Sequence, residues 1–212
     1  MPAKSRTSSI YDTGSVPFRR QRALEPFVAL STRLGLSPDA ISVLAFVAAA
    51  VAGGAYYLAS ETAILYLAGA VLVGLNGALD LLDGAVAREQ QVDSKAGDLL
   101  DHVLDRYADI VVIAGLAAGI GHYPLGFAAV TGVLMTSYLG TQAQAVGLDR
   151  VYAGVLGRAD RLALIGVVTG VAAFVQPSVA GFGPVGWLLV LFAVVGHVTA
   201  LQRFWGAWGA LD

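Results

Sequence analysis

Long apolar stretches alternate with short polar connectors along most of this chain. We predict six apolar segments, at residues 39–59, 63–85, 98–121, 124–146, 160–178 and 184–208. Each has close to the ~20 residues that an α-helix needs to cross the hydrocarbon core of a membrane. The connectors contain turn-forming residues such as Gly121, Pro124, Pro177 and Pro184. The pattern predicts an all-α integral membrane protein with six transmembrane helices.

A polar and basic segment precedes the first apolar stretch. Residues 18–35 predict an amphipathic juxtamembrane helix, with apolar side chains such as Phe27 facing lipid and arginines facing headgroups. The alternative is a basic tail that only enforces the topology. We therefore divide the chain into a polar N-terminal tail (1–17), this helix, and a six-helix transmembrane domain (36–212). The polar start is also unlike a secretory signal peptide.

The composition supports a membrane protein. Of the 212 residues, 57% are hydrophobic and 13% are charged, which is about half the charged share of ~25% in soluble domains. The chain has no cysteine, which excludes disulfides and thiolate metal sites. The net charge of −2 is uninformative, because acidic and basic residues are segregated along the chain.

The basic residues predict how the chain is oriented. All thirteen Lys and Arg lie before the first apolar stretch, around the connectors after the second and the fourth, or near the end of the sixth. The positive-inside rule then puts both termini and the acidic segment on the cytoplasmic side. An odd number of spans would not fit this distribution. We therefore expect a multi-pass protein of the cytoplasmic membrane.

Four aspartates interrupt the second and third apolar stretches. Asp80 and Asp83 are three residues apart, and Asp101 and Asp105 are four apart. On helices, each pair therefore projects from one face. The intervening segment is long enough to reverse direction, so the two faces can meet. Charged side chains at membrane depth are expensive and usually functional, and eight of the fifteen acidic residues fall between positions 80 and 109.

Converging carboxylates need a compensating cation. Oxygen ligands without His or Cys suit Mg²⁺, Mn²⁺ or Ca²⁺ rather than Zn²⁺. Two divalent ions would neutralise four aspartates and attract a pyrophosphate, as in two-metal phosphoryl transfer. The alternatives are solvated aspartates that cap helix ends and the ion site of a divalent-cation transporter. Four aspartates in register argue against the first, and the apolar outer halves 110–120 and 167–175 argue against the second.

The aspartate segment resembles the signature of the CDP-alcohol phosphotransferase family, D-x2-D-G-x2-A-R-x8-G-x3-D-x3-D. The matching residues are Asp80, Asp83, Gly84, Ala87, Arg88, Gly97, Asp101 and Asp105. The predicted six-span layout is also similar to the family, so the resemblance covers nearly the whole chain. It implies a transferase of phospholipid biosynthesis that moves a phosphatidyl-type group from a CDP-activated lipid to an alcohol and releases CMP. Residues 36–212 would then be the catalytic domain.

The resemblance also implies cofactors, partners and residue roles. Two Mg²⁺ or Mn²⁺ ions are expected per active site, in a homodimer among membrane lipids, with no nucleic-acid partner. Asp80, Asp83 and Asp101 would ligate the metals, and Asp105 would join the metal site and deprotonate the acceptor hydroxyl. The residues implied on the CDP-lipid side are Asp39, Ser42, Gly84, Arg88 and Ser94. Asp39 and Ser42 have an equal alternative as part of a helix N-cap.

The acceptor side is most similar to the phosphatidylinositol-phosphate synthase branch of the family. The residues that carry this likeness are Ser137, Tyr138, Arg158, Arg161 and Arg203. Because guanidinium groups match phosphate geometry, the three arginines are expected to bind a polyol phosphate such as glycerol phosphate or inositol phosphate. Topology and headgroup snorkelling are their alternative roles. The branch carries cations where this chain has Gly140 and Gln142, so an uncharged alcohol also remains open.

Overall fold

The computed structural model describes residues 18–92, 94–149 and 156–211, and the predicted polar tail (1–17) lies outside this part. The described residues form seven helices, which confirms the all-α prediction. The helices are α1 (Phe18–Arg33), α2 (Pro38–Leu58), α3 (Ile64–Gln90), α4 (Lys95–Gly119), α5 (Tyr123–Ala145), α6 (Arg158–Ala172) and α7 (Pro184–Leu211).

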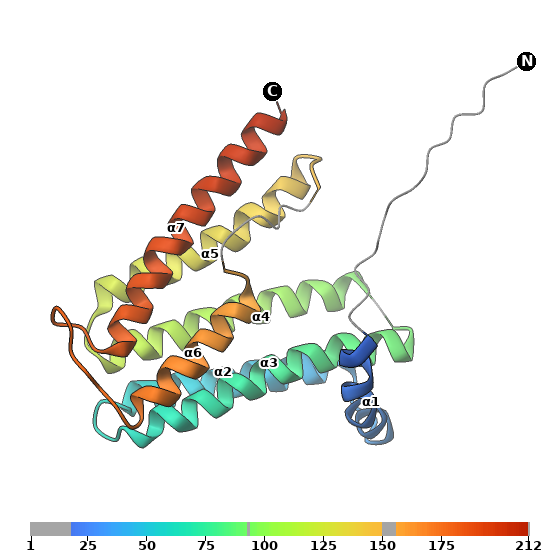
Figure 1. Ribbon diagram of the computed structural model, residues 1–212. Helices are drawn as coiled ribbons and strands as arrows, with labels where there is room; N and C mark the ends of the chain where they lie inside the picture. The colour runs from blue at the N-terminus through green and yellow to red at the C-terminus, as the bar shows by residue number, and fades with distance from the viewer. Residues whose placement is uncertain (1–17, 93, 150–155, 212) are drawn as a thin grey trace, which may run out of the picture.

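The helices form a bundle in which α2 packs against both α3 and α4. On the other side of the bundle α5 pairs with α7, and this pair joins the rest mainly through α4. Figure 1 shows α6 lying across α3 and the short α1 crossing the far end of α3. The C-terminal halves of α5 and α7 point away from α4, so the bundle is splayed at that end.

Three of the described helices are long and apolar enough to cross a membrane. They are α2, α3 and α7. Helix α6 has 15 residues, fewer than the ~20 of a typical span, and α4 carries the acidic residues of the third predicted stretch. The structure thus supports a membrane protein, while the count of six spans stays a prediction.

The starts of α2 and α4 are fixed by short polar side chains. Ser37 caps α2, because its Oγ accepts a hydrogen bond from the Ala40 N–H at 3.2 Å. Ser94 caps α4 in the same way and accepts from the Gly97 N–H at 2.9 Å. Such caps satisfy N–H groups that the first helical turn leaves unpaired. Both helices begin at the end of the bundle where the aspartates lie, because Asp39 and Ser94 line one cavity with Asp83 and Asp101.

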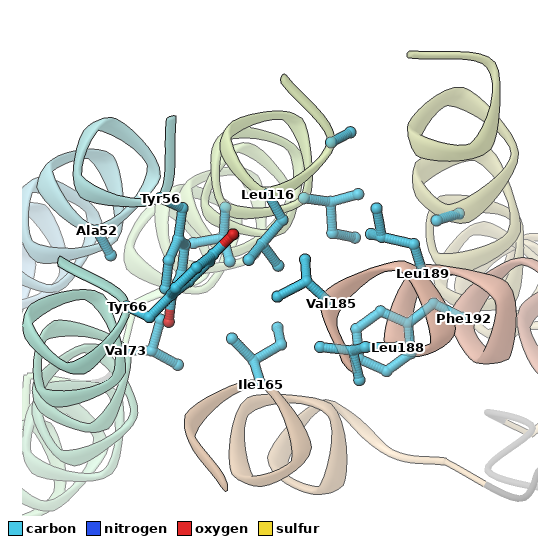
Figure 2. Close-up of a cluster of buried hydrophobic side chains, with 14 of the residues drawn as sticks. Ala52, Tyr56, Tyr66, Val73, Leu116, Ile165, Val185, Leu188, Leu189 and Phe192 are labelled. Carbon is cyan, nitrogen blue, oxygen red and sulfur yellow. The ribbon is translucent and has the colours of Figure 1, made fainter. Parts of the chain in front are cut away.

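A buried apolar core fills the opposite half of the bundle. Figure 2 shows Tyr56, Leu116, Ile165 and Val185 converging from four helices. The Tyr56 hydroxyl is also hydrogen-bonded to Thr169 Oγ1 at 3.0 Å, which ties α2 to α6. The core thus anchors the helices at one end, while the polar residues occupy the other.

Glycines let α2 and α4 approach closely. A side-chain carbon on Gly115 would overlap the backbone of Gly53, and one on Gly53 would overlap the Val111 carbonyl. Small residues at such positions are typical of helices that pack in membranes. This tight contact fixes the position of α4, and hence of its aspartates, relative to α2.

Candidate active site

Three aspartates from two helices converge at the polar end of the bundle. One carboxylate oxygen from each of Asp80, Asp101 and Asp105 lies within 4.8 Å of the other two. The first belongs to α3 and the others to α4, so the two predicted faces do meet. Three carboxylate oxygens at this spacing are a ligand set that suits a hard divalent cation such as Mg²⁺ or Mn²⁺. The residues present therefore fit the expected metal.

Asp83 lies beside this group and is held by two hydrogen bonds. Its Oδ2 accepts from Ser42 Oγ at 2.6 Å, and its Oδ1 accepts from the Gly84 N–H at 2.6 Å. The residue is buried, with 6% of its surface exposed. Its role as a metal ligand remains a prediction, because it is not among the three grouped oxygens. Ser42, expected on the CDP-lipid side, directly orients this aspartate.

Arg158, at the start of α6, bridges two of the aspartates. Its Nη1 donates to Asp80 Oδ1 at 2.6 Å, and its Nη2 lies 2.7 Å from Asp105 Oδ1. Asn76 Oδ1 accepts a longer bond from Nη2 at 3.5 Å. Burial alone would lower the pKa of the Arg158 guanidinium, but the Asp105 and Asp80 carboxylates raise it above its ordinary value. An arginine expected to bind the acceptor therefore sits, charged, on the carboxylate cluster.

Further ion pairs continue along α4 from Asp105. Arg106 Nη2 lies 3.6 Å from Asp105 Oδ2, and its Nη1 lies 3.4 Å from Asp109 Oδ2. Arg161 Nη2, from α6, donates to the same Asp109 oxygen at 3.0 Å. Arg106 also donates to Ser137 Oγ on α5. A chain of acidic and basic side chains thus extends from the aspartate cluster into the space between α4, α5 and α6.

Arg203 reaches the same level of the bundle from α7. Its Nη1 donates to the main-chain carbonyl of Thr136 on α5 at 2.6 Å. Because Arg106 reaches the next residue, Ser137, the two arginines meet neighbouring positions of α5. Arg158 therefore contacts the aspartate carboxylates directly, whereas this hydrogen bond of Arg203 is made to the backbone of α5.

A cavity of about 170 Å³ lies between α2, α3 and α4 and opens onto the carboxylates. Its lining contains every residue expected on the CDP-lipid side, together with Asp83 and Asp101. Those expected residues are Asp39, Ser42, Gly84, Arg88 and Ser94. Gly97 keeps the cavity open, because a side-chain carbon there would lie 3.3 Å from Asp39 Oδ1 and 3.2 Å from Ser94 Oγ.

The start of α2 shows whether Asp39 or Ser42 caps the helix, which was their alternative role. The capping oxygen belongs to Ser37, while Ser42 Oγ donates to Asp83. Asp39 lies in the first turn of the helix and lines the cavity. Both residues are therefore positioned beside the site rather than used as the cap.

Three residues at the site lie outside the aspartate signature, namely Asn76, Arg106 and Asp109, of which only Asp109 was expected to be close enough to influence the site. Asn76 is buried and donates from Nδ2 to the Ala45 carbonyl at 2.9 Å, in addition to its contact with Arg158. Helical periodicity is the signal that would have found two of them. Asn76 precedes Asp80 by four residues and Asp109 follows Asp105 by four, so each shares a helical face with an aspartate of the motif.

The chain is similar to known proteins over most of its length. The profile of the CDP-alcohol phosphatidyltransferase family matches residues 35–199. An archaetidylinositol phosphate synthase of Methanothermobacter thermautotrophicus is 30% identical over 197 residues, covering 90% of this chain and 91% of that protein. A phosphatidylinositol phosphate synthase of Mycobacterium tuberculosis is 31% identical over 201 residues, covering 90% and 89%.

Solved structures of the Mycobacterium tuberculosis phosphatidylinositol phosphate synthase share the fold. The structure with CDP-DAG bound has a TM-score of 0.75 at 29% identity and covers 90% of this chain and 98% of that one. The structure in complex with manganese and citrate has a TM-score of 0.76 at 28% identity and covers 89% and 92%.

The family match confirms the resemblance inferred from the aspartate signature. Together with the apolar helices and the carboxylate cluster, it identifies a membrane transferase of phospholipid biosynthesis that uses Mg²⁺ or Mn²⁺. The chain belongs to the CDP-alcohol phosphatidyltransferase family.

Proposed function

We propose that the protein transfers a phosphatidyl-type group from a CDP-activated lipid to a polyol phosphate, with inositol phosphate and glycerol phosphate as the leading acceptors. The observation that carries this proposal is the cavity that joins the predicted CDP-lipid residues to the carboxylates of Asp83 and Asp101. The archaetidylinositol phosphate synthase and the phosphatidylinositol phosphate synthase among the relatives support the choice of acceptor class.

In the proposed reaction Asp105 accepts the proton of the acceptor hydroxyl. The acceptor oxygen then forms a bond to the phosphorus on the lipid side of the pyrophosphate. The bond from that phosphorus to the bridging oxygen breaks, and this oxygen leaves with CMP. General-base catalysis of this kind contributes typically ~10²–10⁴-fold. Divalent ions held by Asp80, Asp83, Asp101 and Asp105 would supply stabilisation of the charge on the attacking and leaving oxygens.

The CDP-lipid side is proposed to consist of the cavity-lining residues. Arg88 would donate to the pyrophosphate as a charged, bidentate group. Gly84 leaves its backbone accessible, since the nearest atom to a side chain built there is Arg88 Nη1 at 3.4 Å. Asp39, Ser42 and Ser94 would provide polar contacts to the nucleotide.

The acceptor side is proposed to consist of Arg158, Arg161 and Arg203. Arg158 is the nearest of these to the base, at 2.7 Å from Asp105 Oδ1. A guanidinium at this place favours an acceptor that carries a phosphate. Gly140 is buried and supplies no cation, but Arg106 from α4 brings a positive charge to the neighbouring Ser137. The charge at this level of α5 therefore also favours an anionic acceptor over a neutral alcohol.

We also propose six transmembrane helices, with α1 on the membrane surface and both termini and the active site facing the cytoplasm. The exposed apolar side chains of α1 support a surface position, since Phe27 and Leu30 are each more than half exposed. A homodimer is proposed from the family resemblance. Light scattering of the purified protein should then give twice the 21.8 kDa of one chain, and a monomer mass would reject the dimer.

The reaction is tested by measuring CMP release. Purified protein would receive Mn²⁺ or Mg²⁺, an ester- or ether-linked CDP-lipid, and inositol phosphate, glycerol phosphate or a neutral alcohol. We expect CMP only when the CDP-lipid and a phosphate-bearing acceptor are both present, and none after chelation of the metal. The substitution Asp105→Asn should abolish release while CDP-lipid binding persists, with Asp149→Asn, an exposed aspartate, as control. No CMP with any acceptor would contradict the proposal.

A further inference from the structure

Two ion pairs connect α6 to α4 at successive levels of the bundle. Arg158 Nη2 lies 2.7 Å from Asp105 Oδ1, and Arg161 Nη2 lies 3.0 Å from Asp109 Oδ2. The arginines are three residues apart on α6 and the aspartates four apart on α4, so each pair of side chains leaves its helix on one face. The two ion pairs therefore form successive cross-links between the same two helix faces.

The two ion pairs join α6 to α4 through side chains. Within the described residues, α6 packs its backbone against α3 and α7, whereas it reaches α4 through side chains. Among the residues that the structure describes, no close backbone contact fixes the position of α6 along α4. The ion pairs are thus suited to set where the first turn of α6 lies relative to the aspartates.

The two cross-links differ in how accessible they are. The Arg158 and Asp105 side chains are 15% and 17% exposed, and those of Arg161 and Asp109 are 7% and 5% exposed. Separating a buried ion pair leaves an uncompensated charge in a low-dielectric environment. The Arg161–Asp109 pair is therefore held closed, while the Arg158–Asp105 pair remains within reach of a substrate.

Asp109 also compensates a second cation. Its Oδ2 lies 3.4 Å from Arg106 Nη1, so one carboxylate oxygen faces guanidinium groups from both α4 and α6. Without its charge, Arg106 and Arg161 would repel each other across this space. Loss of the carboxylate should therefore displace the start of α6, which carries Arg158.

We propose that Asp109 is a positioning residue for the acceptor. It acts through Arg161, which it fixes against α4, and thereby places Arg158 where a phosphate-bearing acceptor meets the base Asp105. The inference rests on the proposed function, which assigns Arg158 to the acceptor side of the site. It gives Asp109, which lies outside the aspartate signature, a defined part in acceptor recognition.

The first test is the effect of Asp109→Asn on the two Michaelis constants, with inositol phosphate as the acceptor probe. We expect the KM for the acceptor to rise roughly 10- to 100-fold, the range seen when outer residues that orient a site are lost. The KM for the CDP-lipid should not change, because its cavity is lined from α2, α3 and α4. A general loss of structure would instead alter both constants, and Asp149→Asn should alter neither.

A double substitution tests whether Asp109 acts through Arg161. Arg161→Gln should raise the acceptor KM to a similar extent, and the pair Asp109→Asn with Arg161→Gln should be no worse than either alone. Residues that act through one contact are not additive. Fully additive effects would overturn the proposed route through Arg161.

A distance measurement tests the position of α6 without turnover. The chain has no cysteine, so spin labels can be attached at Tyr107→Cys on α4 and Val167→Cys on α6, both more than half exposed in the native chain. Asp109→Asn should shift or broaden the label distance, and Asp149→Asn should not. An unchanged distance, or an unchanged acceptor KM, overturns the proposal. If the unsubstituted protein releases no CMP, the proposed function fails, while the distances still report on the Asp109 cross-link.

Discussion

Arg158 illustrates how one side chain can serve two conflicting demands at this site. Its guanidinium lies 2.6 Å from an oxygen of Asp80 and 2.7 Å from an oxygen of Asp105. The same two aspartates contribute to the group of oxygens that suits a divalent cation. A guanidinium and a divalent ion beside these carboxylates repel each other, so Arg158 opposes metal binding, whereas its proposed role is to offer a charge to the acceptor.

The conflict gives a prediction for Arg158→Gln. Removal of the positive charge should raise the affinity for Mn²⁺ roughly tenfold or more, as expected for a unit charge a few ångströms away. The affinity for inositol phosphate should fall at the same time. Free Mn²⁺ can be titrated by electron paramagnetic resonance, with Asp149→Asn as control. Weaker or unchanged Mn²⁺ binding in the variant would show that Arg158 does not compete with the metal.

At the scale of the helices, the contact between α2 and α4 holds the site together. Gly53 and Gly115 allow the two backbones to approach, and both helices begin beside the cavity. Asp39 comes from one of these helices and Asp101 from the other. A change in the helix separation would therefore move residues on both sides of the cavity.

This contact predicts opposite effects for two glycine substitutions. Gly115→Ala should lower the free energy of unfolding by about 1–3 kcal/mol, because the added methyl group overpacks the contact. Gly54→Ala meets no atom within 4 Å and should be neutral, or stabilising by up to ~1 kcal/mol through helix propensity. Thermal unfolding in detergent compares the two variants. Equal stabilities would mean that the helices can separate without cost.

The apolar pattern predicts that the helices exist better than it predicts the residues at which they end. Helix α3 was expected to end at residue 85 and continues to Gln90, because its polar last turn still forms helical hydrogen bonds. The fifth apolar stretch was expected to reach residue 178, whereas α6 ends at Ala172; Pro177 disfavours helix only at the residue before it, Gln176. Hydropathy reports where a segment is apolar, and backbone hydrogen bonding decides where a helix ends.

At the site, too, features set by neighbouring residues could be predicted, and features set by packing between distant helices could not. The spacing of Asp80, Asp101 and Asp105 was readable because helical periodicity is local, and the structure brings these residues together. The pairing of Arg161 with Asp109 was not readable, because it depends on how α6 packs beside a helix that is distant in the chain. Sequence therefore predicted the carboxylates and missed the cross-link beneath them.

At the scale of the whole molecule, the polar end of the bundle is predicted to face the cytoplasm. The connectors at the other end lack Lys and Arg, while those beside the aspartates contain them. The absence of cysteine makes this orientation directly measurable with single introduced thiols.

Thiol labelling in intact cells tests the orientation. A membrane-impermeant maleimide should label Glu61→Cys and Ser178→Cys from outside, because both lie in connectors without basic residues. Asp149→Cys should react only after the membrane is permeabilised, because it lies in the connector that carries Arg150 and Arg158. All three residues are exposed in the native chain. Labelling of position 149 in intact cells would contradict the six-span topology.

The bridge made by Arg158 also has a consequence for how the protein is made. Asp80 and Asp105 leave the ribosome before the arginine that pairs with them, which follows Asp105 by some fifty residues. For a chain that lengthens at about 5–20 residues per second, this interval lasts several seconds. The nascent α3–α4 hairpin must therefore form without its later partner. The arrival of α6 is the biosynthetic step that gives Asp80 and Asp105 the one arginine that bridges them in the described part of the chain.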